Sequence, residues 1–171
     1  MRVFKEEQRF NQLWIILLLG IGMLVPLGLI LGAYLKNQSS FTPIELVVTI
    51  SIIVLASCII FFFKLYTRID EHGIHYKFFP FHLKYRSIAW NAIDEAYVRT
   101  YDALNEYGGW GFKGGALWKK SKGTAINVSG DKGIQLRLKN GKKLLIGTQK
   151  ENDAKSILAT YKTKIKAQDH G

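Results

Sequence analysis

Three glycines have the most suggestive spacing for chemistry in this chain of 171 residues. Gly109, Gly111 and Gly114 fit the G-x-G-x-x-G pattern of loops that hold nucleotide phosphates, in which a strand precedes the loop and a helix begins directly after it. The residues after Gly114 read ALWKKSKGTAINV, which predicts no amphipathic helix, and the Gly-Lys-Ser/Thr ending of a Walker loop is missing. We therefore expect no nucleotide and no other cofactor at these glycines.

The same stretch mixes its glycines with aromatic side chains, and two interpretations remain open. In one, the glycines permit tight turns and bulges while the aromatic rings cover the core of a domain. In the other, the rings form an exposed tip with lysines beside it, which inserts at a membrane interface or docks on a protein partner. The candidate binding residues are Tyr107, Gly109, Trp110, Gly111, Phe112, Lys113, Trp118, Lys119, Lys120 and Lys122.

Other polar residues form no recognisable catalytic pattern. His72, His75 and His82 lie close together in sequence, but no fourth metal ligand has suitable spacing, so we expect solvated histidines. Two adjacent acidic pairs are also present, Asp70–Glu71 and Asp94–Glu95. Neighbouring residues on a strand point to opposite faces, so neither pair makes an acid–base couple. We predict no catalytic residue, no metal site and no enzymatic activity.

Two apolar segments near the N-terminus are long enough to cross a membrane. Residues 13–35 contain no charge, and residues 44–66 begin with an apolar run whose one acid, Glu45, is expected at the external interface. Each would span about 30 Å of hydrocarbon at about 1.5 Å per residue, whereas the apolar part of a signal peptide has about 7–15 residues. We predict two transmembrane helices. Gly28 and Gly32 are candidate packing residues, because small residues at this spacing let helices approach closely.

Basic residues near the predicted spans set their orientation, because cytoplasmic loops carry an excess of Lys and Arg. The connector carries only Lys36, whereas five basic residues flank the other ends of the spans: Arg2, Lys5, Arg9, Lys64 and Arg68. Both termini are therefore predicted to be cytoplasmic. The predicted parts are a cytoplasmic N-terminal segment 1–12, spans 13–35 and 44–66, an external loop 36–43 and a cytoplasmic domain 67–171.

The cytoplasmic domain has the pattern of a mostly antiparallel β domain. Strands are predicted at 66–70, 74–79, 83–90, 95–101, 124–129, 134–139 and 142–148, the last two joined by a tight turn at Asn140-Gly141. A C-terminal amphipathic helix follows, with a capping box at Thr148-x-x-Glu151. Its apolar stripe consists of Ala154, Ile157, Leu158, Tyr161 and Ile165.

Three stretches carry a resemblance to a known family: IDEHGIHY, SIAWNAIDEAYV and GIQLRLKNGKKLLIGTQKENDAKSIL. These stretches contain strands, a Trp-x-x-Ile turn and a final hairpin with a helix. In this order they resemble the pleckstrin-homology-like (PH-like) barrel. Together with the two spans, they look like the small bacterial membrane proteins that carry a bacterial PH domain, some of which also resemble this chain in the YGGWGF run. The resemblance implies a PH-like barrel at a bacterial inner membrane. It transfers no catalytic residues, because the family has no common active site.

The charge of the chain is strongly positive, with a formal net charge of +11. Residues 67–171 hold 19 Lys and Arg against 10 Asp and Glu. A domain held below the cytoplasmic leaflet would be attracted to anionic lipid headgroups, while the plainer interpretation is a solvated surface that keeps the protein soluble and oriented. Basic β-barrels with exposed aromatic residues also bind single-stranded nucleic acid, but a membrane anchor already accounts for the basic bias, so nucleic acid is the weaker prediction.

Two functions follow from these patterns. The first is a non-catalytic, membrane-anchored PH-like module that binds anionic lipid headgroups or a protein partner around residues 107–122. The second is an accessory subunit whose cytoplasmic domain serves only as a scaffold. Its transmembrane hairpin would hold it in a larger complex or homo-oligomer through the helix face of Gly28 and Gly32.

Overall fold

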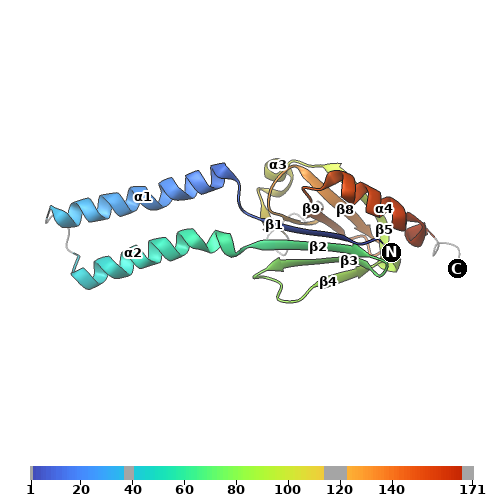
Figure 1. Cartoon of the computed structure of the whole chain (residues 1–171), viewed down its shortest axis with the longest axis horizontal. Coiled ribbons are helices and arrows are strands. Elements are labelled where there is room, and N and C mark those ends of the chain that lie inside the picture. The colour runs from blue at the N-terminus through green and yellow to red at the C-terminus, as the bar shows by residue number, and fades with distance from the viewer. Residues whose placement is uncertain (1, 37–40, 114–122, 167–171) are drawn as a thin grey trace. The chain divides into compact units, whose positions relative to one another are not determined.

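The structure is a computed structural model that describes residues 2–36, 41–113 and 123–166 (Figure 1). The chain divides into two compact units. The helical unit is Phe10–Phe63, and the β unit combines Met1–Arg9 with Lys64–Gly171. The helical unit is thus inserted in sequence between the first residues of the β unit and the rest of it.

The helical unit consists of α1 (Leu13–Leu35), α2 (Pro43–Cys58) and the short 3₁₀ helix η1 (Ile59–Phe62). Leu13–Leu35 and the continuous stretch Pro43–Phe62 have 23 and 20 residues, and both are long and apolar enough to cross a membrane. Residues 64–66, which the sequence pattern placed in the second span, belong instead to the following strand.

Glu45 has a local structural role at the start of α2. Its carboxylate accepts a 2.8 Å hydrogen bond from the backbone N–H of Thr42, and the Thr42 hydroxyl accepts one of 3.3 Å from the Glu45 N–H. This is a capping box, with Pro43 at the first helical position, where its missing N–H costs no hydrogen bond. Glu45 is exposed.

Gly28 and Gly32 do not pack closely within the helical unit. A Cβ built on either residue would meet no heavy atom within 4 Å among the described residues. Ile15 of α1 and Leu46 of α2 are the buried side chains of the two helices. The contact of α1 with α2 therefore does not depend on the glycine face predicted to mediate it.

The first sheet of the β unit has the order β1-β2-β3-β4, and all its pairs are antiparallel. Its strands are β1 (Phe4–Arg9), β2 (Lys64–Asp70), β3 (Gly73–Phe79) and β4 (Arg86–Ala89). The sequence pattern left residues 1–12 as a separate segment, but β1 pairs with β2 along its whole length, from Phe4 opposite Ile69 to Arg9 opposite Lys64.

The second sheet has the order β5-β8-β9-β7-β6. Its strands are β5 (Ile93–Thr100), β6 (Gly111–Lys113), β7 (Thr124–Asn127), β8 (Lys132–Leu138) and β9 (Lys143–Gly147). The pair β7–β9 is parallel and the others are antiparallel. The strand ladders of the described residues thus form two sheets with mostly antiparallel strands, and they do not close into one barrel.

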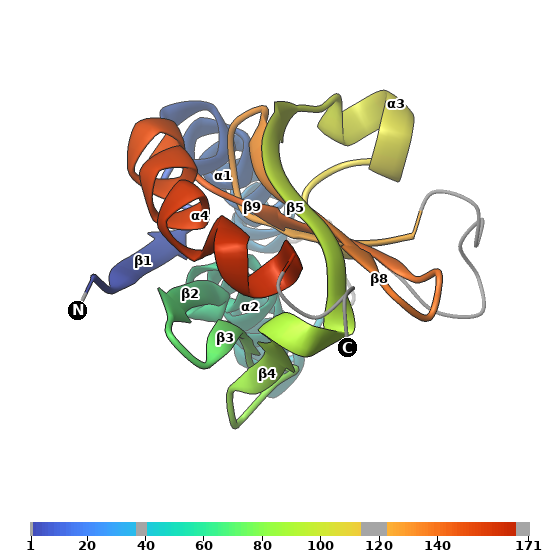
Figure 2. The ribbon, with the colours of Figure 1, turned by 90° about the vertical axis from the view of Figure 1, so that its right-hand side faces the viewer.

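The C-terminal helix α4 (Glu151–Lys166) packs on the β unit through the predicted stripe and contacts β5, β8 and β1 (Figure 2). Ala154, Ile157, Leu158 and Tyr161 are buried. The Tyr161 ring stacks on Trp90, which belongs to the 3₁₀ turn η2 (Trp90–Ala92), with ring centroids 5.3 Å apart. The amphipathic helix predicted here is confirmed.

Polar side chains fasten β1 to the elements before α4. The Glu6 carboxylate accepts 2.7 Å hydrogen bonds from the Thr148 hydroxyl and from the Gln149 N–H. The Gln8 amide donates to the carbonyl of Gly147 at 2.7 Å. Thr148 thus does not form the predicted capping box: its hydroxyl donates to Glu6 and accepts from the N–H of Lys150, while α4 begins at Glu151.

Candidate functional site: a basic groove and an aromatic edge

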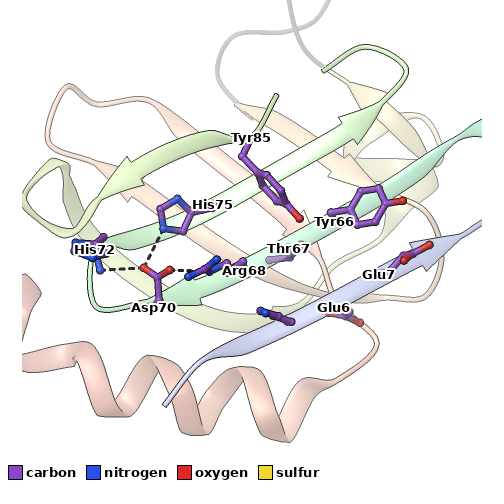
Figure 3. Close-up of a pocket in the computed structure, with 10 residues that line it drawn as sticks. Glu6, Glu7, Tyr66, Thr67, Arg68, Asp70, His72, His75 and Tyr85 are labelled. Carbon is purple, nitrogen blue, oxygen red and sulfur yellow. Dashed lines mark hydrogen bonds and ion pairs between the residues drawn. The ribbon is translucent and has the colours of Figure 1, made fainter. Parts of the chain in front are cut away.

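A surface groove of about 640 Å³ lies on the outer face of β1, β2 and β3 (Figure 3). The alternation of side chains along a strand decides which residues reach it. On β2, Leu65, Thr67 and Ile69 are buried, so Tyr66 and Arg68 project outward. The lining residues used below are Lys5, Tyr66, Arg68, Asp70, His75 and Tyr85.

Strand register places three basic side chains in one row across the groove. Lys5 of β1 lies opposite Arg68 of β2, and Arg68 lies opposite His75 of β3. Directly paired residues on one face have Cβ atoms about 5 Å apart. The row therefore presents neighbouring nitrogen donors to the groove, although Lys5 and Arg68 are more than sixty residues apart in the chain.

Asp70 organises one end of this row. Its carboxylate accepts hydrogen bonds from Arg68 Nε at 2.8 Å and from the His72 N–H at 3.0 Å, and its Oδ1 lies 3.0 Å from His75 Nε2. Burial alone would raise the pKa of Asp70, but the His75 and His72 hydrogen bonds and the charges of His75 and Arg68 outweigh it and lower the pKa to about 2. Asp70 is therefore ionised at neutral pH and holds Arg68 and His75 in place.

Ser87 of β4 extends the arrangement. His75 Nδ1 lies 2.7 Å from Ser87 Oγ, so hydroxyl, imidazole and carboxylate form a hydrogen-bonded chain in the order of a hydrolase triad. Acyl transfer also requires donors aimed at the developing oxyanion. Among the described residues, the Ser87 hydroxyl has its recorded hydrogen bond with His75 alone, on an exposed edge strand. We interpret this chain as fixing the His75 ring.

Lys77 lies between two tyrosines beside the groove. Its Nζ is 4.7 Å from the centroid of the Tyr66 ring and 5.4 Å from that of the Tyr85 ring. Both tyrosines project from the face shown in Figure 3. Two aromatic rings thus flank this ammonium group, and no carboxylate within the described ranges forms an ion pair with it.

The histidines differ from the solvated set expected from the sequence. His72 is exposed as predicted, with 78% of its side chain accessible, whereas the His75 side chain is only 18% accessible. His82 is buried, and its Nδ1 accepts the Phe78 N–H at 3.3 Å. Burial and the nearby Arg86 charge lower the pKa of His82. The prediction was wrong for His82 because tertiary packing covers a loop residue.

The described part of the glycine stretch, as far as Lys113, forms the end of a short helix and the start of a strand, while Gly114 lies outside the described residues. Helix α3 (Ala103–Tyr107) ends at Gly108, whose φ is 68° and whose N–H donates to Leu104 O. The N–H of Gly109 donates to Ala103 O at 2.7 Å, and that of Gly111 to Asn127 Oδ1 at 2.9 Å. These amides already donate within the protein, so they do not form an open phosphate cradle.

Tyr107 and Trp110 belong to the domain core rather than to an exposed tip. Tyr107 is 1% exposed, and its hydroxyl accepts a 3.1 Å hydrogen bond from Arg99, which also pairs with Glu106 at 2.7 Å. Trp110 packs against the cluster of Tyr107, Tyr101, Ala103, Ala125 and Leu145. Its Nε1 donates to Gly130 O at 3.2 Å. For Trp110, the interpretation as a cover of the core is confirmed.

Phe112 has different surroundings. Its ring stacks on Phe81 of the β3–β4 loop, with centroids 5.9 Å apart, and Phe81 stacks on the buried Phe78 at 5.8 Å. Phe81 is 61% exposed and Leu83 of the same loop 78%. We call Phe81, Leu83 and Phe112 the aromatic edge. Of the other predicted binding residues, Lys113 is half-buried in β6, and Trp118, Lys119, Lys120 and Lys122 lie outside the described residues.

Sequence reasoning did not identify the groove or the β3–β4 loop. The groove requires β1, in which two of the three inward positions are polar, Glu6 and Gln8, so its alternation is not visible in hydropathy. The loop did carry a signal, because Phe79, Phe81 and Leu83 follow one another at every second position on both sides of Pro80.

No protein-family model matches this chain, and neither a curated protein nor a solved structure matches it.

Proposed function

We propose that this chain is a non-catalytic binding module, anchored in a bacterial inner membrane by α1 and α2, whose cytoplasmic β unit recognises anionic lipid headgroups in the groove. The observation that carries the proposal is the fixed Arg68. Its Nε is held by the buried Asp70, which leaves the terminal guanidinium nitrogens available beside Lys5. A guanidinium held in this way can donate parallel hydrogen bonds to two oxygens of a phosphate group.

The charges around the groove favour an anion over a cation. Its carboxylates already have partners: Glu6 binds Thr148 and Gln149, Glu7 pairs with Arg9 at 2.6 Å, and Asp70 binds Arg68 and both histidines nearby. Among the described residues, no carboxylate pairs with Lys5 or Lys77. An incoming anion would gain these two ammonium groups as partners, whereas a cation would have to displace an existing partner.

The connection to the two helices favours a lipid as the source of that anion. Residues 10–12 alone separate β1 from α1, and only Phe63 separates η1 from β2. A strand that leaves a spanning helix so directly starts at the membrane surface, where the cytoplasmic leaflet carries anionic lipids. Arg9 and Lys64 lie opposite each other at that end of the sheet.

A PH-like architecture for the β unit agrees with two mostly antiparallel sheets followed by a C-terminal helix. The open arrangement of the two sheets, which share no strand, is the feature that departs from a complete barrel. The assignment as a bacterial PH domain is accordingly part of the proposal.

The experiment is a calorimetric titration of the full chain in detergent micelles with three soluble probes: dioctanoyl phosphatidic acid, dioctanoyl phosphatidylcholine and inorganic phosphate. Phosphatidic acid should bind more tightly than phosphatidylcholine, and Arg68→Gln should weaken it about tenfold, as expected for a lost charge-assisted hydrogen bond of about 1.4 kcal/mol or more. Lys142→Gln, in the exposed β8–β9 turn, is the matched charge control. Equal affinity of the two lipids, or an unchanged Arg68→Gln variant, would reject headgroup recognition and leave a protein partner as the ligand. Inorganic phosphate binding as well as the lipid would assign the groove to phosphate in general.

A further inference from the structure

We propose that the aromatic edge is a membrane wedge, whose exposed side chains Phe81 and Leu83 enter the interfacial layer of the bilayer that α1 and α2 cross. This inference rests on the membrane-anchoring part of the proposed function and is independent of headgroup recognition in the groove. The partner proposed for the aromatic edge is the interfacial layer of the lipid bilayer.

The β3–β4 loop exposes several large apolar side chains. Phe81 is 61% exposed, Leu83 is 78% exposed, and the neighbouring Tyr85 is 49% exposed. Contiguous apolar side chains on the surface of a domain mark an interaction site. The transfer of such side chains out of water is favourable in proportion to the area buried.

The loop is held rigidly in its exposed position. The His82 N–H donates to Phe78 O at 2.8 Å, and the Phe78 N–H donates back to His82 Nδ1. The Phe81 ring stacks on Phe78 with an interplanar angle of 11°, and Phe112 of β6 stacks on Phe81. The outward direction of Phe81 is therefore set by buried neighbours, and insertion would require little additional ordering of the loop.

The chain fixes the distance of this loop from the end of the second helix. Phe79, the last residue of β3, lies opposite Lys64, which is the second residue after Phe62. Two residues reach at most about 7 Å, and a paired strand adds about 5 Å. The loop that starts after Phe79 thus begins within about 12 Å of the helix end, whatever the orientation of the two units.

Charged residues next to these apolar side chains also favour a surface that contacts the bilayer. Lys84 and Arg86 follow Leu83 in the chain and are exposed, and Lys64 lies at the same end of the sheet. Apolar and aromatic side chains beside Lys and Arg are the composition of segments that lie in the bilayer interface, where the rings enter and the cations meet anionic headgroups.

The test uses spin labels on the full chain in vesicles of phosphatidylcholine and phosphatidylglycerol. The only cysteine, Cys58, is first replaced in a Cys58→Ser background, and single cysteines are introduced as Leu83→Cys, Lys142→Cys and Leu24→Cys. Lys142 is the exposed control, because it lies in the β8–β9 turn, outside both the groove and the aromatic edge. This turn belongs to the Asp70 end of the β unit: the Lys139 N–H donates to Ala92 O of η2, and Trp90 of η2 donates to Asp70 O. Asp70 is six strand residues, or about 20 Å, from Lys64. Leu24, in the middle of α1, reports the membrane anchor itself.

We expect the label at Leu83 to collide more often with membrane-soluble oxygen than with a water-soluble nickel chelate, as at Leu24, and the label at Lys142 to show the reverse. If Leu24 is embedded while Leu83 behaves like Lys142, the wedge is wrong and the membrane anchor is supported. If Leu24 is itself exposed to the chelate, the membrane anchor is wrong, and the membrane wedge, which depends on it, is wrong as well. A Leu83 label shielded from both reagents, with dipolar broadening between two copies, would show a protein interface and would also overturn the wedge.

Discussion

Arg68 and Asp70 lie two residues apart on β2 and form an ion pair of 2.8 Å, in which the carboxylate is almost completely buried and the guanidinium is half-exposed. The buried Asp70 carboxylate thereby fixes the orientation of the exposed Arg68 guanidinium. This relationship makes Arg68 a prearranged donor rather than a flexible surface charge, and it links the stability of the β2–β3 hairpin to the proposed binding site.

The lowered pKa of Asp70 predicts an acid-dependent loss of stability. A carboxyl whose folded pKa of about 2 lies below its ordinary 3.8 stabilises the fold fully above pH 3.8, and this contribution disappears as the pH falls toward 2. The contribution is about 2 kcal/mol, since one pKa unit corresponds to about 1.4 kcal/mol. Denaturant titrations of the full chain at several pH values should show this slope in the wild type and not in Asp70→Asn. A parallel slope in both proteins would mean that Asp70 is not the responsible group.

His82 predicts a second pH effect, close to neutrality. Its pKa lies below the ordinary 6.5, so the folded state prefers the neutral imidazole, whose Nδ1 accepts the Phe78 N–H. Stability from this site is present above pH 6.5 and decreases as the pH falls below it. Hydrogen exchange at the Phe78 amide should therefore accelerate, relative to its intrinsic rate, on acidification. His82→Gln should remove the pH dependence and His72→Gln should retain it; the opposite assignment would contradict the role of His82.

Glu6 predicts that β1 is an integral part of the β unit. Its two carboxylate oxygens accept hydrogen bonds from Thr148 and Gln149, so Glu6→Gln replaces one acceptor oxygen by a donor and should lower the free energy of unfolding by about 1–3 kcal/mol. The adjacent Glu7, which is exposed and pairs with Arg9, provides the control, and Glu7→Gln should cost less than about 1 kcal/mol. Urea denaturation measures both, and equal losses would argue against the attachment of β1 through Glu6.

The hydrogen-bonded chain of Ser87, His75 and Asp70 provides a test of the non-catalytic assignment. We expect that a fluorophosphonate probe does not label the folded full chain, because a hydroxyl–imidazole–carboxylate chain by itself supplies no donors to the oxyanion of acyl transfer. Ser87→Ala should give the same background signal. Labelling of the wild type that is lost in Ser87→Ala would identify a serine nucleophile and reverse the assignment.

Much of the fold follows from local patterns in the sequence. The uncharged run of α1 and the stripe of Ala154, Ile157, Leu158 and Tyr161 have the periods and lengths of the helices observed. The last hairpin turns where predicted, and Gly141 there has a φ of 78°. These elements are determined by residues that lie close together in the sequence, so a local sequence pattern predicts them.

The elements that were not predicted depend on distant partners. Glu6 and Gln8 occupy inward positions of β1, and their hydrogen-bond partners Thr148 and Gly147 lie about 140 residues further along the chain. A strand whose buried face is polar does not register as a strand until those partners are known. The groove depends on β1 and therefore could not be found. The two interpretations of the glycine stretch remained open because its contacts, such as the hydrogen bond from the Gly111 N–H to Asn127, join residues that no local pattern connects.

The most direct test of the central claim is competitive lipid retention by the full chain. The wild type, Arg68→Gln and the control Lys142→Gln would be released from micelles that contain equal amounts of phosphatidic acid and phosphatidylcholine, and the retained lipids counted by native mass spectrometry. The proposal predicts that the wild type and Lys142→Gln retain phosphatidic acid preferentially and that Arg68→Gln loses this preference. Equal retention of the two lipids by the wild type, or an unchanged preference in Arg68→Gln, would contradict headgroup recognition in the groove.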